Sequence, residues 1–337
     1  MAYTIQVAGS EISFPCDEAT TLLDAAQAAG YELPYSCRNG VCGNCRGQIR
    51  SGEVSAPPTG DGYLMFCQTR PRSDLVIVPR GISRVDPSAR KVVQAKVYRV
   101  TPAADDVSLL QLRFPAGVKV KFKAGQYLDV LLGDGSRRSF SMANPPQSSD
   151  GALLHIRRLP GGKFSDGVLG TLAAGDIVRV ELPFGDFYLR EDSPTPMVFV
   201  ASGTGFAPIK SMLEDMFRRG LQRESVLYWG GRREKDLYAM DLPQKWAAQH
   251  PWLRFVPVLS EPESGWTGRT GFVHRAVMED LPDLSGHQVY ACGVTAMIEA
   301  ARADFTARCG LPPDAFFCDA FVTPADQAAG AQDTVPG

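Results

Sequence analysis

Four cysteines with a distinctive spacing constrain this chain more than any other feature of its 337 residues. Cys37, Cys42 and Cys45 follow the pattern C-x4-C-x2-C, and Cys67 comes later, after the mainly apolar residues 63–66. A [2Fe–2S] cluster needs four thiolates that arrive from different directions, and this is the plant-type spacing of such ligands. The glycines in the loop lack a Cβ, so backbone N–H groups can turn toward the sulfurs. The sequence therefore predicts an iron–sulfur site, with a zinc site and a disulfide pair as the alternatives.

Composition and charge exclude several classes of function. The net charge of −2 leaves no basic footprint for nucleic acid. No run of eighteen apolar residues predicts a membrane span, and the N-terminus lacks the charged and apolar regions of a secretory signal. Eight cysteines, four of them assigned to a cluster, fit a reducing cytoplasm. We therefore expect a cytoplasmic protein that binds neither membrane nor nucleic acid, and we favour a monomer.

The first 88 residues predict a small α+β domain. Residues 4–7 and 11–14 alternate in polarity around Gly9, which indicates a hairpin. A helix is expected over residues 21–30, with Gly30 at its carboxyl end. Strands are expected at 48–50 and 75–78, and residues 79–87 are typical of a linker.

Residues 91–192 predict a small antiparallel β-barrel, because helical periodicity is nearly absent. The expected strands are residues 92–100, 107–114, 126–132, 153–158 and 177–181.

Residues 193–324 alternate strand and helix and predict a doubly wound α/β domain. The apolar strand 197–201 runs into a glycine-rich turn and then a helix over 209–219, an arrangement that cradles phosphates. Further strands are expected at 226–229, 255–259 and 288–291. The polar residues 325–337 predict a disordered tail.

The cysteine loop C-R-N-G-V-C-G-N-C and residues 63–71 closely resemble the ferredoxin domains of oxygenase reductases. That resemblance implies a β-grasp ferredoxin fold for residues 1–88. The gap from Cys45 to Cys67 is several residues shorter than is usual in plant-type ferredoxins, and the shortening would fall in residues 53–62.

Two motifs in the second segment resemble those of the ferredoxin–NADP reductase family. The first is R-S-F-S, where the resemblance implies that Arg138 pairs with a flavin phosphate, Phe140 lies along the flavin ring and Ser141 reaches N5. Phenylalanine here replaces the usual tyrosine. The later segment L-P-F-G-D-F resembles the family's G-P-x-G-x-F, with Leu182 where the first glycine is usual. The second motif is G-G-K-F-S at residues 161–165, which resembles the family's flavin-pyrophosphate segment and so favours FAD over FMN. The full set of expected flavin-binding residues is Arg138, Ser139, Phe140, Ser141, His155, Ile156, Arg157, Gly161, Gly162, Lys163, Phe164 and Ser165.

The third segment carries two further motifs of the same family. G-T-G-F-A-P resembles the family's dinucleotide turn, and C-G-V-T-A-M resembles its C-G-x-x-x-M at a strand end, where a nicotinamide site is expected. The resemblance also implies an aromatic residue near the flavin at the carboxyl end, either Phe317 or Phe321. The expected nucleotide-site residues are Gly203, Thr204, Gly205, Pro208, Cys292, Gly293, Met297 and Phe321, with Ser141, Cys292 and Phe321 as catalytic candidates.

The choice between NADPH and NADH depends on the end of the second strand of the doubly wound sheet. Arginines there accommodate a 2′-phosphate, whereas a carboxylate binds the ribose 2′-OH. This sequence has Arg232 and Arg233, followed by Glu234. We therefore expect NADPH, with NADH as the alternative.

The order of the three segments is that of single-chain reductases which supply oxygenases, and it covers residues 3–323. The resemblance implies an NAD(P)H-dependent iron–sulfur flavoprotein oxidoreductase, in which a hydride passes to FAD and single electrons reach the [2Fe–2S] cluster and then a terminal oxygenase component. The reductases of ring-hydroxylating dioxygenases that act on aromatic carboxylates such as terephthalate are the nearest resemblance. Reductases of CDP-6-deoxy-glucoseen-type deoxysugar dehydratases and of phenol or methane hydroxylases share this architecture. A redox-sensing iron–sulfur protein is the alternative of another class, although a sensor would not need a hydride source.

Overall fold

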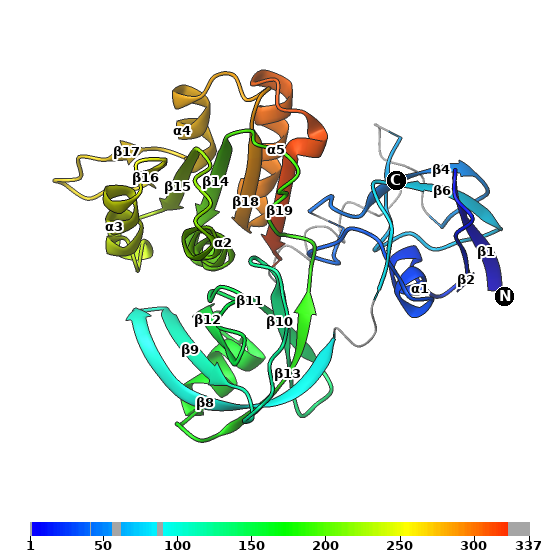
Figure 1. Ribbon diagram of the computed structural model, residues 1–337, viewed down its shortest axis with the longest axis horizontal. Helices are drawn as coiled ribbons and strands as arrows, with labels where there is room; N and C mark the ends of the chain where they lie inside the picture. The colour runs from blue at the N-terminus through cyan, green and yellow to red at the C-terminus, as the bar shows by residue number, and fades with distance from the viewer. Residues whose placement is uncertain (1, 41, 56–61, 86–89, 323–337) are drawn as a thin grey trace. The chain divides into compact units, whose positions relative to one another are not determined.

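The computed structural model describes residues 2–40, 42–55, 62–85 and 90–322. The chain divides between residues 89 and 90 into two compact units, and the second unit ends at Phe321. The predicted tail, residues 325–337, and most of the shortened connection between Cys45 and Cys67 lie outside the described residues. Figure 1 shows the elements of each unit, coloured along the chain.

The first unit is a small mixed sheet with one helix. Its sheet has the order β2-β1-β6-β4-β5, in which β1 and β6 are parallel and the other neighbours are antiparallel. The short strands β3 and β7 form a separate pair. The elements are β1 (Ala2–Val7), β2 (Ser13–Asp17), α1 (Leu22–Ala28), β3 (Tyr31–Glu32), β4 (Arg46–Ser51), β5 (Leu64–Met65), β6 (Leu75–Pro79) and β7 (Ser83–Arg84).

Helix α1 lies within the predicted range of residues 21–30 and is shorter than predicted at both ends. The Thr21 hydroxyl accepts a hydrogen bond from the Asp24 backbone N–H at 3.2 Å, which is an N-cap. Gly30 follows the helix with a φ of 81°, a conformation that favours glycine. The preceding hairpin differs in register from the prediction, since β2 begins at Ser13 and not at residue 11.

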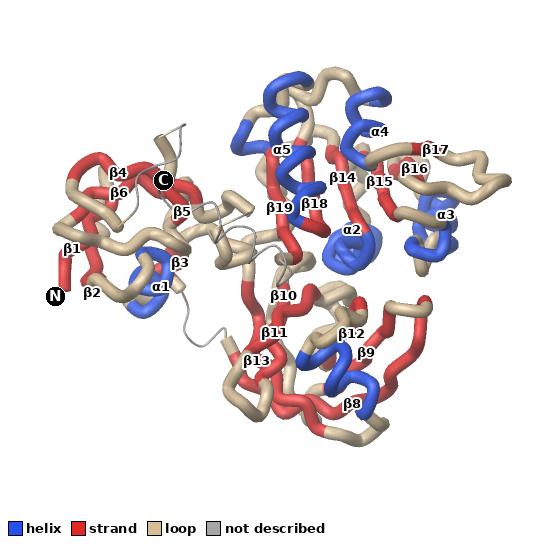
Figure 2. The backbone as a smooth tube through the Cα atoms, turned by 180° about the vertical axis from the view of Figure 1, so that it is seen from behind, coloured by secondary structure: helices blue, strands red, loops and turns tan. Residues whose placement is uncertain are grey.

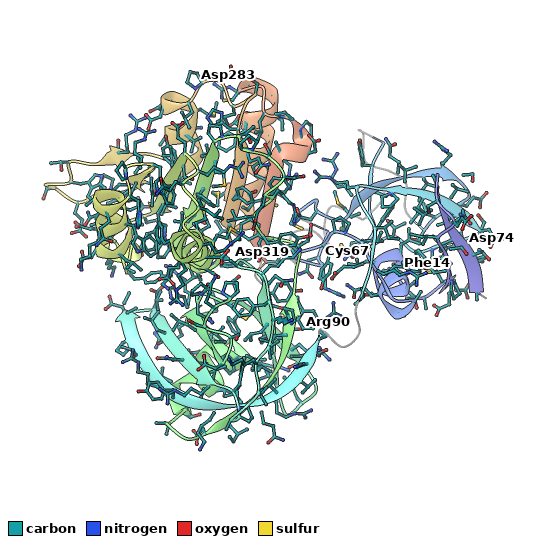
Figure 3. The ribbon with its side chains drawn as sticks, viewed as in Figure 1. Phe14, Cys67, Asp74, Arg90, Asp283 and Asp319 are labelled. Carbon is teal, nitrogen blue, oxygen red and sulfur yellow. The ribbon has the colours of Figure 1, made fainter. Side chains whose placement is uncertain are left out.

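The side chains of the first unit are shown in Figure 3, where Phe14, Cys67 and Asp74 are labelled. Phe14 is buried and its ring centroid lies 6.3 Å from that of Tyr31. The Asp74 carboxylate accepts a hydrogen bond from the Thr4 backbone N–H at 2.7 Å, which ties β1 to the segment before β6. These contacts fix the small core on which the cysteine loop is mounted.

The second unit begins with an antiparallel barrel of order β11-β10-β13-β8-β9-β12. An isolated bridge between Met142 and Leu154 joins the first and last strands and closes the barrel. Its strands are β8 (Lys91–Ala104), β9 (Val107–Arg113), β10 (Tyr127–Leu131), β11 (Arg137–Ser141), β12 (Gly151–Arg157) and β13 (Ile177–Phe184). Two short helical segments, η1 (Lys163–Val168) and η2 (Leu169–Thr171), follow β12. The sequence analysis lists no strand at β11, because its alternating Arg, Ser and Phe residues lack an apolar run.

The rest of the second unit is a parallel doubly wound sheet of order β17-β16-β15-β14-β18-β19. The strands are β14 (Met197–Ser202), β15 (Ser225–Gly231), β16 (Leu253–Leu259), β17 (Arg269–Thr270), β18 (Gln288–Val294) and β19 (Phe316–Phe321). The helices are η3 (Gly203–Gly205), α2 (Phe206–Arg219), η4 (Glu234–Asp236), α3 (Asp241–Gln249), α4 (Val273–Asp280), α5 (Thr295–Arg308) and η5 (Pro313–Ala315).

The order of strands in this sheet reverses between β14 and β18. The chain moves outward from β14 to β15 and β16 through α2 and α3, and it moves in the other direction from β18 to β19 through α5. Right-handed crossovers place helices of these two halves on opposite faces of the sheet. Figure 2 shows these helices and the strands between them. Ligands bind at such a switch point, outside the carboxyl ends of the strands.

Candidate functional site

The four cysteines of the predicted cluster site form two pairs of thiols. Cys37 is hydrogen-bonded to Cys42, and this contact, followed by burial, raises the pKa of Cys37. Cys45 is hydrogen-bonded to Cys67, and that contact raises the pKa of Cys45 and lowers that of Cys67. The two pairs also interact electrostatically with each other.

This pairing distinguishes between a single metal ion and a cluster. Within the described ranges, no group of three or more His, Cys, Asp and Glu side chains is close enough to hold one ion. A [2Fe–2S] cluster has two irons, so two neighbouring thiol pairs suit it. All eight cysteines are free thiols, which argues against the disulfide alternative. The residues present therefore fit a two-iron cluster better than zinc.

The cysteine loop turns backbone donors toward its sulfurs. The N–H groups of Asn39 and Cys42 donate to Cys37 Sγ, with N–S distances of 3.4 and 3.3 Å. Gly40 and Gly43 have φ values of 78° and 71°, as the sequence analysis expects of residues that allow such turns. N–H···S contacts of this kind stabilise negative charge on the sulfurs.

The two predicted flavin motifs meet on one face of the barrel. Arg138 and Phe140 are two positions apart on β11, so their side chains lie on the same face of the strand. Phe140 pairs with Leu128 of β10. The Phe140 ring centroid is 5.4 Å from that of Phe164, which belongs to the second motif. Residues that are 24 positions apart in sequence are thus in contact: Phe164 is buried in the barrel core, and the partly buried Phe140 packs against that core and offers an apolar ring, which suits a flavin.

The hydroxyl of Ser141 is unusual in its hydrogen bonding. Its Oγ is buried and has no hydrogen-bond partner in the described chain. A buried hydroxyl without a partner is costly, and a flavin atom would supply one. Ser139, by contrast, donates to Asp129 at 2.7 Å and is exposed, so its hydroxyl is already engaged in the barrel itself.

The second motif opens a helical segment, as the sequence predicts. Helix η1 begins at Lys163, directly after Gly162. The Lys163 ammonium lies 2.5 Å from the Asp134 carboxylate, so its charge is compensated within the barrel. The Ser165 hydroxyl accepts a hydrogen bond from the Leu159 N–H at 3.2 Å, and the Gly161 N–H donates to Asp166. These bonds hold the turn in shape before any phosphate binds.

The glycine-rich turn after β14 packs directly against the end of β18. A Cβ on Gly205 would lie 2.1 Å from the carbonyl oxygen of Cys292, which no side chain can tolerate. Gly203 has a φ of 52°, and its carbonyl accepts a hydrogen bond from the Trp229 indole at 3.0 Å. Thr204 and Pro208 are buried beside it, and the proline occupies the first turn of α2, where a missing N–H costs nothing. The two motifs thus build one corner at the switch point.

Cys292, Gly293 and Met297 lie on the other side of that corner. The Cys292 side chain is fully buried, and burial raises the pKa of its thiol, so it is not a thiolate at neutral pH. A Cβ on Gly293 would lie 2.0 Å from Ser202 Oγ. Met297 is buried in the first turn of α5. Strand β18 runs on to Val294, three residues beyond the predicted strand end at residue 291.

Phe317 and Phe321, the two aromatic residues of which one is expected near the flavin, both lie on β19. Phe317 stacks on Tyr290, with 5.1 Å between ring centroids, and Arg190 lies 5.0 Å from its centroid. Phe321 ends the strand opposite Val294 and is partly buried against the core of the doubly wound sheet. Phe317 is therefore already in a core contact, while Phe321 lies closer to the corner formed by residues 292–294.

A charged pocket of about 320 Å³ lies at the carboxyl ends of β15 and β16. Four basic and four acidic side chains line it together with Ala104: Arg157, Arg232, Arg233, Lys235, Asp105, Asp106, Asp236 and Glu261. Asp236 accepts hydrogen bonds from the backbone N–H groups of Arg232 and Arg233, at 2.9 and 3.0 Å. Of the acidic residues that line this pocket, Asp236 and Glu261 belong to the doubly wound half of the unit. Glu234 is not among the lining residues.

Residues 155–157 are predicted to bind the flavin, but in the structure their side chains point to different places. Ile156 is in the barrel core, and His155 Nδ1 lies 2.8 Å from Tyr238 Oη. Arg157 faces the charged pocket, where its Nη1 is 3.1 Å from Asp106. Its Nη2 is buried without a partner in the described chain, and it lies 3.3 Å from where a Cβ on Gly203 would be.

Several lining residues of the pocket escaped the sequence analysis. Asp105 and Asp106 occupy the turn between β8 and β9, about 130 residues from Lys235, to which Asp105 is paired at 3.2 Å. No local motif marks such residues, because only the packing of the barrel against the doubly wound sheet brings them to the pocket. Among the described helices, none is long and apolar enough to cross a membrane.

Comparison with known protein families supports each part of this architecture. The chain matches a 2Fe-2S iron-sulfur cluster binding domain over residues 5–72, an oxidoreductase FAD-binding domain over 94–188 and an oxidoreductase NAD-binding domain over 199–303. The fold and site thus define an iron–sulfur flavoprotein reductase.

Individual relatives share this organisation along their whole length. The chain is 41% identical to a reductase component of terephthalate 1,2-dioxygenase from Comamonas sp., covering 96% of this chain and 98% of the relative. It is 40% identical to a CDP-6-deoxy-L-threo-D-glycero-4-hexulose-3-dehydrase reductase from Yersinia pseudotuberculosis serotype I (strain IP32953), covering 96% and 99%. Among solved structures, the Amycolatopsis cytochrome P450 reductase GcoB matches with a TM-score of 0.76 and 35% identity, covering 95% and 99%.

The chain therefore belongs to the family of single-chain reductases that join a [2Fe–2S] ferredoxin domain to FAD-binding and NAD-binding domains. It is an NAD(P)H-dependent oxidoreductase that passes electrons through FAD and a [2Fe–2S] cluster. When bound, the flavin accepts a hydride as an electron pair and releases single electrons, which the cluster carries. The predicted fold class and cofactors are confirmed.

Proposed function

We propose that this protein is the reductase component that supplies a terminal oxygenase acting on an aromatic carboxylate of the terephthalate type. The observation that carries the proposal is the 41% identity to the terephthalate 1,2-dioxygenase reductase component over 98% of that relative. A deoxysugar dehydrase partner is the second candidate, because its reductase is 40% identical over 99% of its length. The partner is the part of the function that the two relatives do not share.

We infer that Cys37, Cys42, Cys45 and Cys67 hold the cluster. The two thiol pairs and the backbone N–H donors to Cys37 support this assignment. Cys37 is partly exposed, whereas Cys42, Cys45 and Cys67 are buried, so Cys37 is the most accessible residue of the four.

For the flavin, we propose that Phe140 lies along the ring with the buried Phe164 packed behind it, that Arg138 pairs with a phosphate and that Ser141 donates to the ring edge. The unpartnered, buried hydroxyl of Ser141 supports this role. Gly161, Gly162, Lys163 and Ser165 form the turn that faces the phosphates, with Ser139 in the adjacent strand. Replacing Ser141 with alanine should slow flavin reduction by NAD(P)H at saturating nucleotide and leave the KM nearly unchanged, because the lost contact is to the flavin.

For the nucleotide, we propose that the pyrophosphate lies over Gly203, Thr204 and Gly205, and that Arg157 donates to it through the unpartnered Nη2. Arg232 and Arg233, which line the charged pocket, would then bind the 2′-phosphate of NADPH. The same pocket also contains carboxylates, which can bind the ribose 2′-OH of NADH, so NADH remains the alternative substrate. Cys292, Gly293, Met297 and Phe321 complete the proposed nicotinamide corner.

We further propose domain boundaries of 1–88, 91–192 and 193–324, a monomeric state and a cytoplasmic location. The break between residues 89 and 90 is consistent with the first boundary. The barrel and the doubly wound sheet share one compact unit, so the second boundary rests on the change from antiparallel to parallel strands.

The proposal is tested by anaerobic titration of the purified holoprotein with NADPH and, separately, NADH, followed by visible absorbance. Bleaching of both flavin and iron–sulfur bands is expected, with NADPH effective at the lower concentration. Candidate partners are then compared by coupled turnover, with purified terephthalate-type dioxygenase in one series and deoxysugar dehydrase in the other. Turnover with the dehydrase and none with the dioxygenase would reject the oxygenase partner while leaving the electron path intact.

A further inference from the structure

Gln68 joins the two segments that carry the cysteines. Its Nε2 lies 3.7 Å from Cys67 Sγ and 3.0 Å from the carbonyl oxygen of Arg38. Its Cγ also lies 3.0 Å from where a Cβ on Gly40 would be, so the side chain runs along the cysteine loop. Gln68, which follows the fourth cysteine, is therefore hydrogen-bonded to the loop that carries the other three.

The Arg38 carbonyl is a fixed acceptor. Arg38 has a φ of 56°, which is uncommon for a residue other than glycine. Its guanidinium holds this conformation through Asp24 at 2.9 Å, through Gln27, and by lying 4.5 Å from the Tyr35 ring centroid. Since the backbone at residue 38 is anchored to α1, its carbonyl can orient the Gln68 amide.

A primary amide has two N–H donors, which matches the two acceptors seen here. One N–H bonded to the Arg38 carbonyl leaves the other available to the Cys67 sulfur. The donors to Cys37 Sγ are backbone groups, which remain after any substitution other than by proline. Cys67 receives a backbone N–H from Gly40 and, in addition, this side-chain donor. Gln68 is thus a contact to a cluster sulfur that mutation can delete.

We propose that Gln68 is a positioning residue that raises the reduction potential of the cluster by donating an N–H to the Cys67 sulfur. The inference rests on the proposed cluster ligands. One-electron reduction adds negative charge to the cluster, and a donor to a ligand sulfur stabilises that charge, so the reduced state is favoured. Because the side chain is exposed while Cys67 is only 5% exposed, removing the amide leaves the core of the first unit intact.

The test is a spectroelectrochemical titration of the holoprotein and two variants, Gln68→Met and Gln68→Glu. Methionine has a similar length and no donor, and glutamate is isosteric but adds a negative charge. The cluster potential should become more negative in both, and more so for glutamate. For methionine, the equilibrium constant for reduction should fall about threefold to tenfold, where tenfold is 59 mV for one electron. The flavin potential should not move.

The matched control is Gln48→Met, at an exposed glutamine on β4 of the same unit whose side chain makes no hydrogen bond to a cysteine among the described residues. Its cluster potential should equal that of the unchanged protein. An unchanged or more positive potential in Gln68→Met would overturn the inference. Loss of the cluster in both Gln68 variants with retained secondary structure would also overturn it, because the residue would then be needed for ligation and not for tuning. Absence of a [2Fe–2S] signal in the unchanged protein would instead reject the proposed ligands.

Discussion

His155 Nδ1 lies 2.8 Å from Tyr238 Oη, and this hydrogen bond joins strand β12 of the barrel to the segment after β15 of the doubly wound sheet. His155 is buried and Tyr238 is partly buried, and their rings meet edge to face with 5.5 Å between centroids. The bond therefore fixes the nucleotide half of the second unit against its flavin half, next to the charged pocket that Arg157 lines from the same strand.

The His155–Tyr238 bond predicts a pH dependence of stability. Burial, followed by the charge of Lys210, lowers the pKa of His155 to about 3, whereas an unfolded histidine titrates near 6.5. Between these values the unfolded state binds the extra proton, so stability falls as the pH drops below 6.5, by up to about 1.4 kcal/mol per pH unit. Denaturant unfolding at pH 7.0 and 5.0 should show this loss, and His155→Gln should show a smaller one. Equal losses in the two proteins would contradict the assignment.

Tyr238→Phe should destabilise the second unit without changing its charge. The substitution leaves the buried His155 nitrogen without its partner, which costs about 1–3 kcal/mol. Thermal unfolding of the holoprotein checks the prediction, and Tyr98→Phe serves as control because Tyr98 is an exposed residue of β8. Similar midpoints for the two variants would show that the bond contributes nothing to stability.

Gly205→Ala should abolish tight binding of the dinucleotide. Its new Cβ would meet the Cys292 carbonyl at 2.1 Å, so the turn after β14 and the end of β18 must move apart, at a cost of about 2 kcal/mol or more. Binding of NADPH and NADH is measured by absorbance titration. The control is Gly286→Ala, where no atom lies within 4 Å of the added methyl group. Retained nucleotide affinity in Gly205→Ala would disprove the close packing of these two motifs.

Arg232→Ala combined with Arg233→Ala should weaken NADPH and spare NADH. Each guanidinium can form charge-assisted bonds to a 2′-phosphate, so the KM for NADPH should rise about tenfold or more. The comparison is the ratio of KM values for the two nucleotides at constant ionic strength. A double control, Arg99→Ala with Arg179→Ala, removes the same charge from barrel strands β8 and β13, away from the pocket. An unchanged ratio in the pocket variant would mean that the 2′-phosphate is bound elsewhere.

Cys42→Ser should separate the flavin activity from the cluster activity. Loss of one ligand of the Cys37–Cys42 pair removes the cluster, so NAD(P)H-driven reduction of cytochrome c should be abolished. Reduction of ferricyanide, which takes electrons from the flavin, should persist. Cys309→Ser, a buried thiol in the nucleotide half, should retain both activities. Loss of both activities in a folded, flavin-bound Cys42→Ser protein would contradict the order of electron transfer.

The sequence by itself determined the parts that depend on local chemistry. The C-x4-C-x2-C spacing, the cap of α1 at Thr21 and the glycine turn at residues 203–205 each express a short-range requirement of ligation, hydrogen bonding or backbone angle. These requirements can be read from neighbouring residues, and the fold class and cofactors followed from them. Strand β11 was not predicted, because its pairing with β10 makes it a strand and its own residues do not signal one.

Only the tertiary structure decided which distant side chains share a site. It separated His155 from Arg157, sending one to Tyr238 and the other to the charged pocket. It also brought Asp106 to Arg157 and placed the Gln68 amide between Cys67 and Arg38. Such contacts depend on how barrel, sheet and loop pack, and packing is a property of the whole chain that no local spacing encodes. The balance of basic and acidic side chains in the charged pocket is therefore set by the tertiary structure.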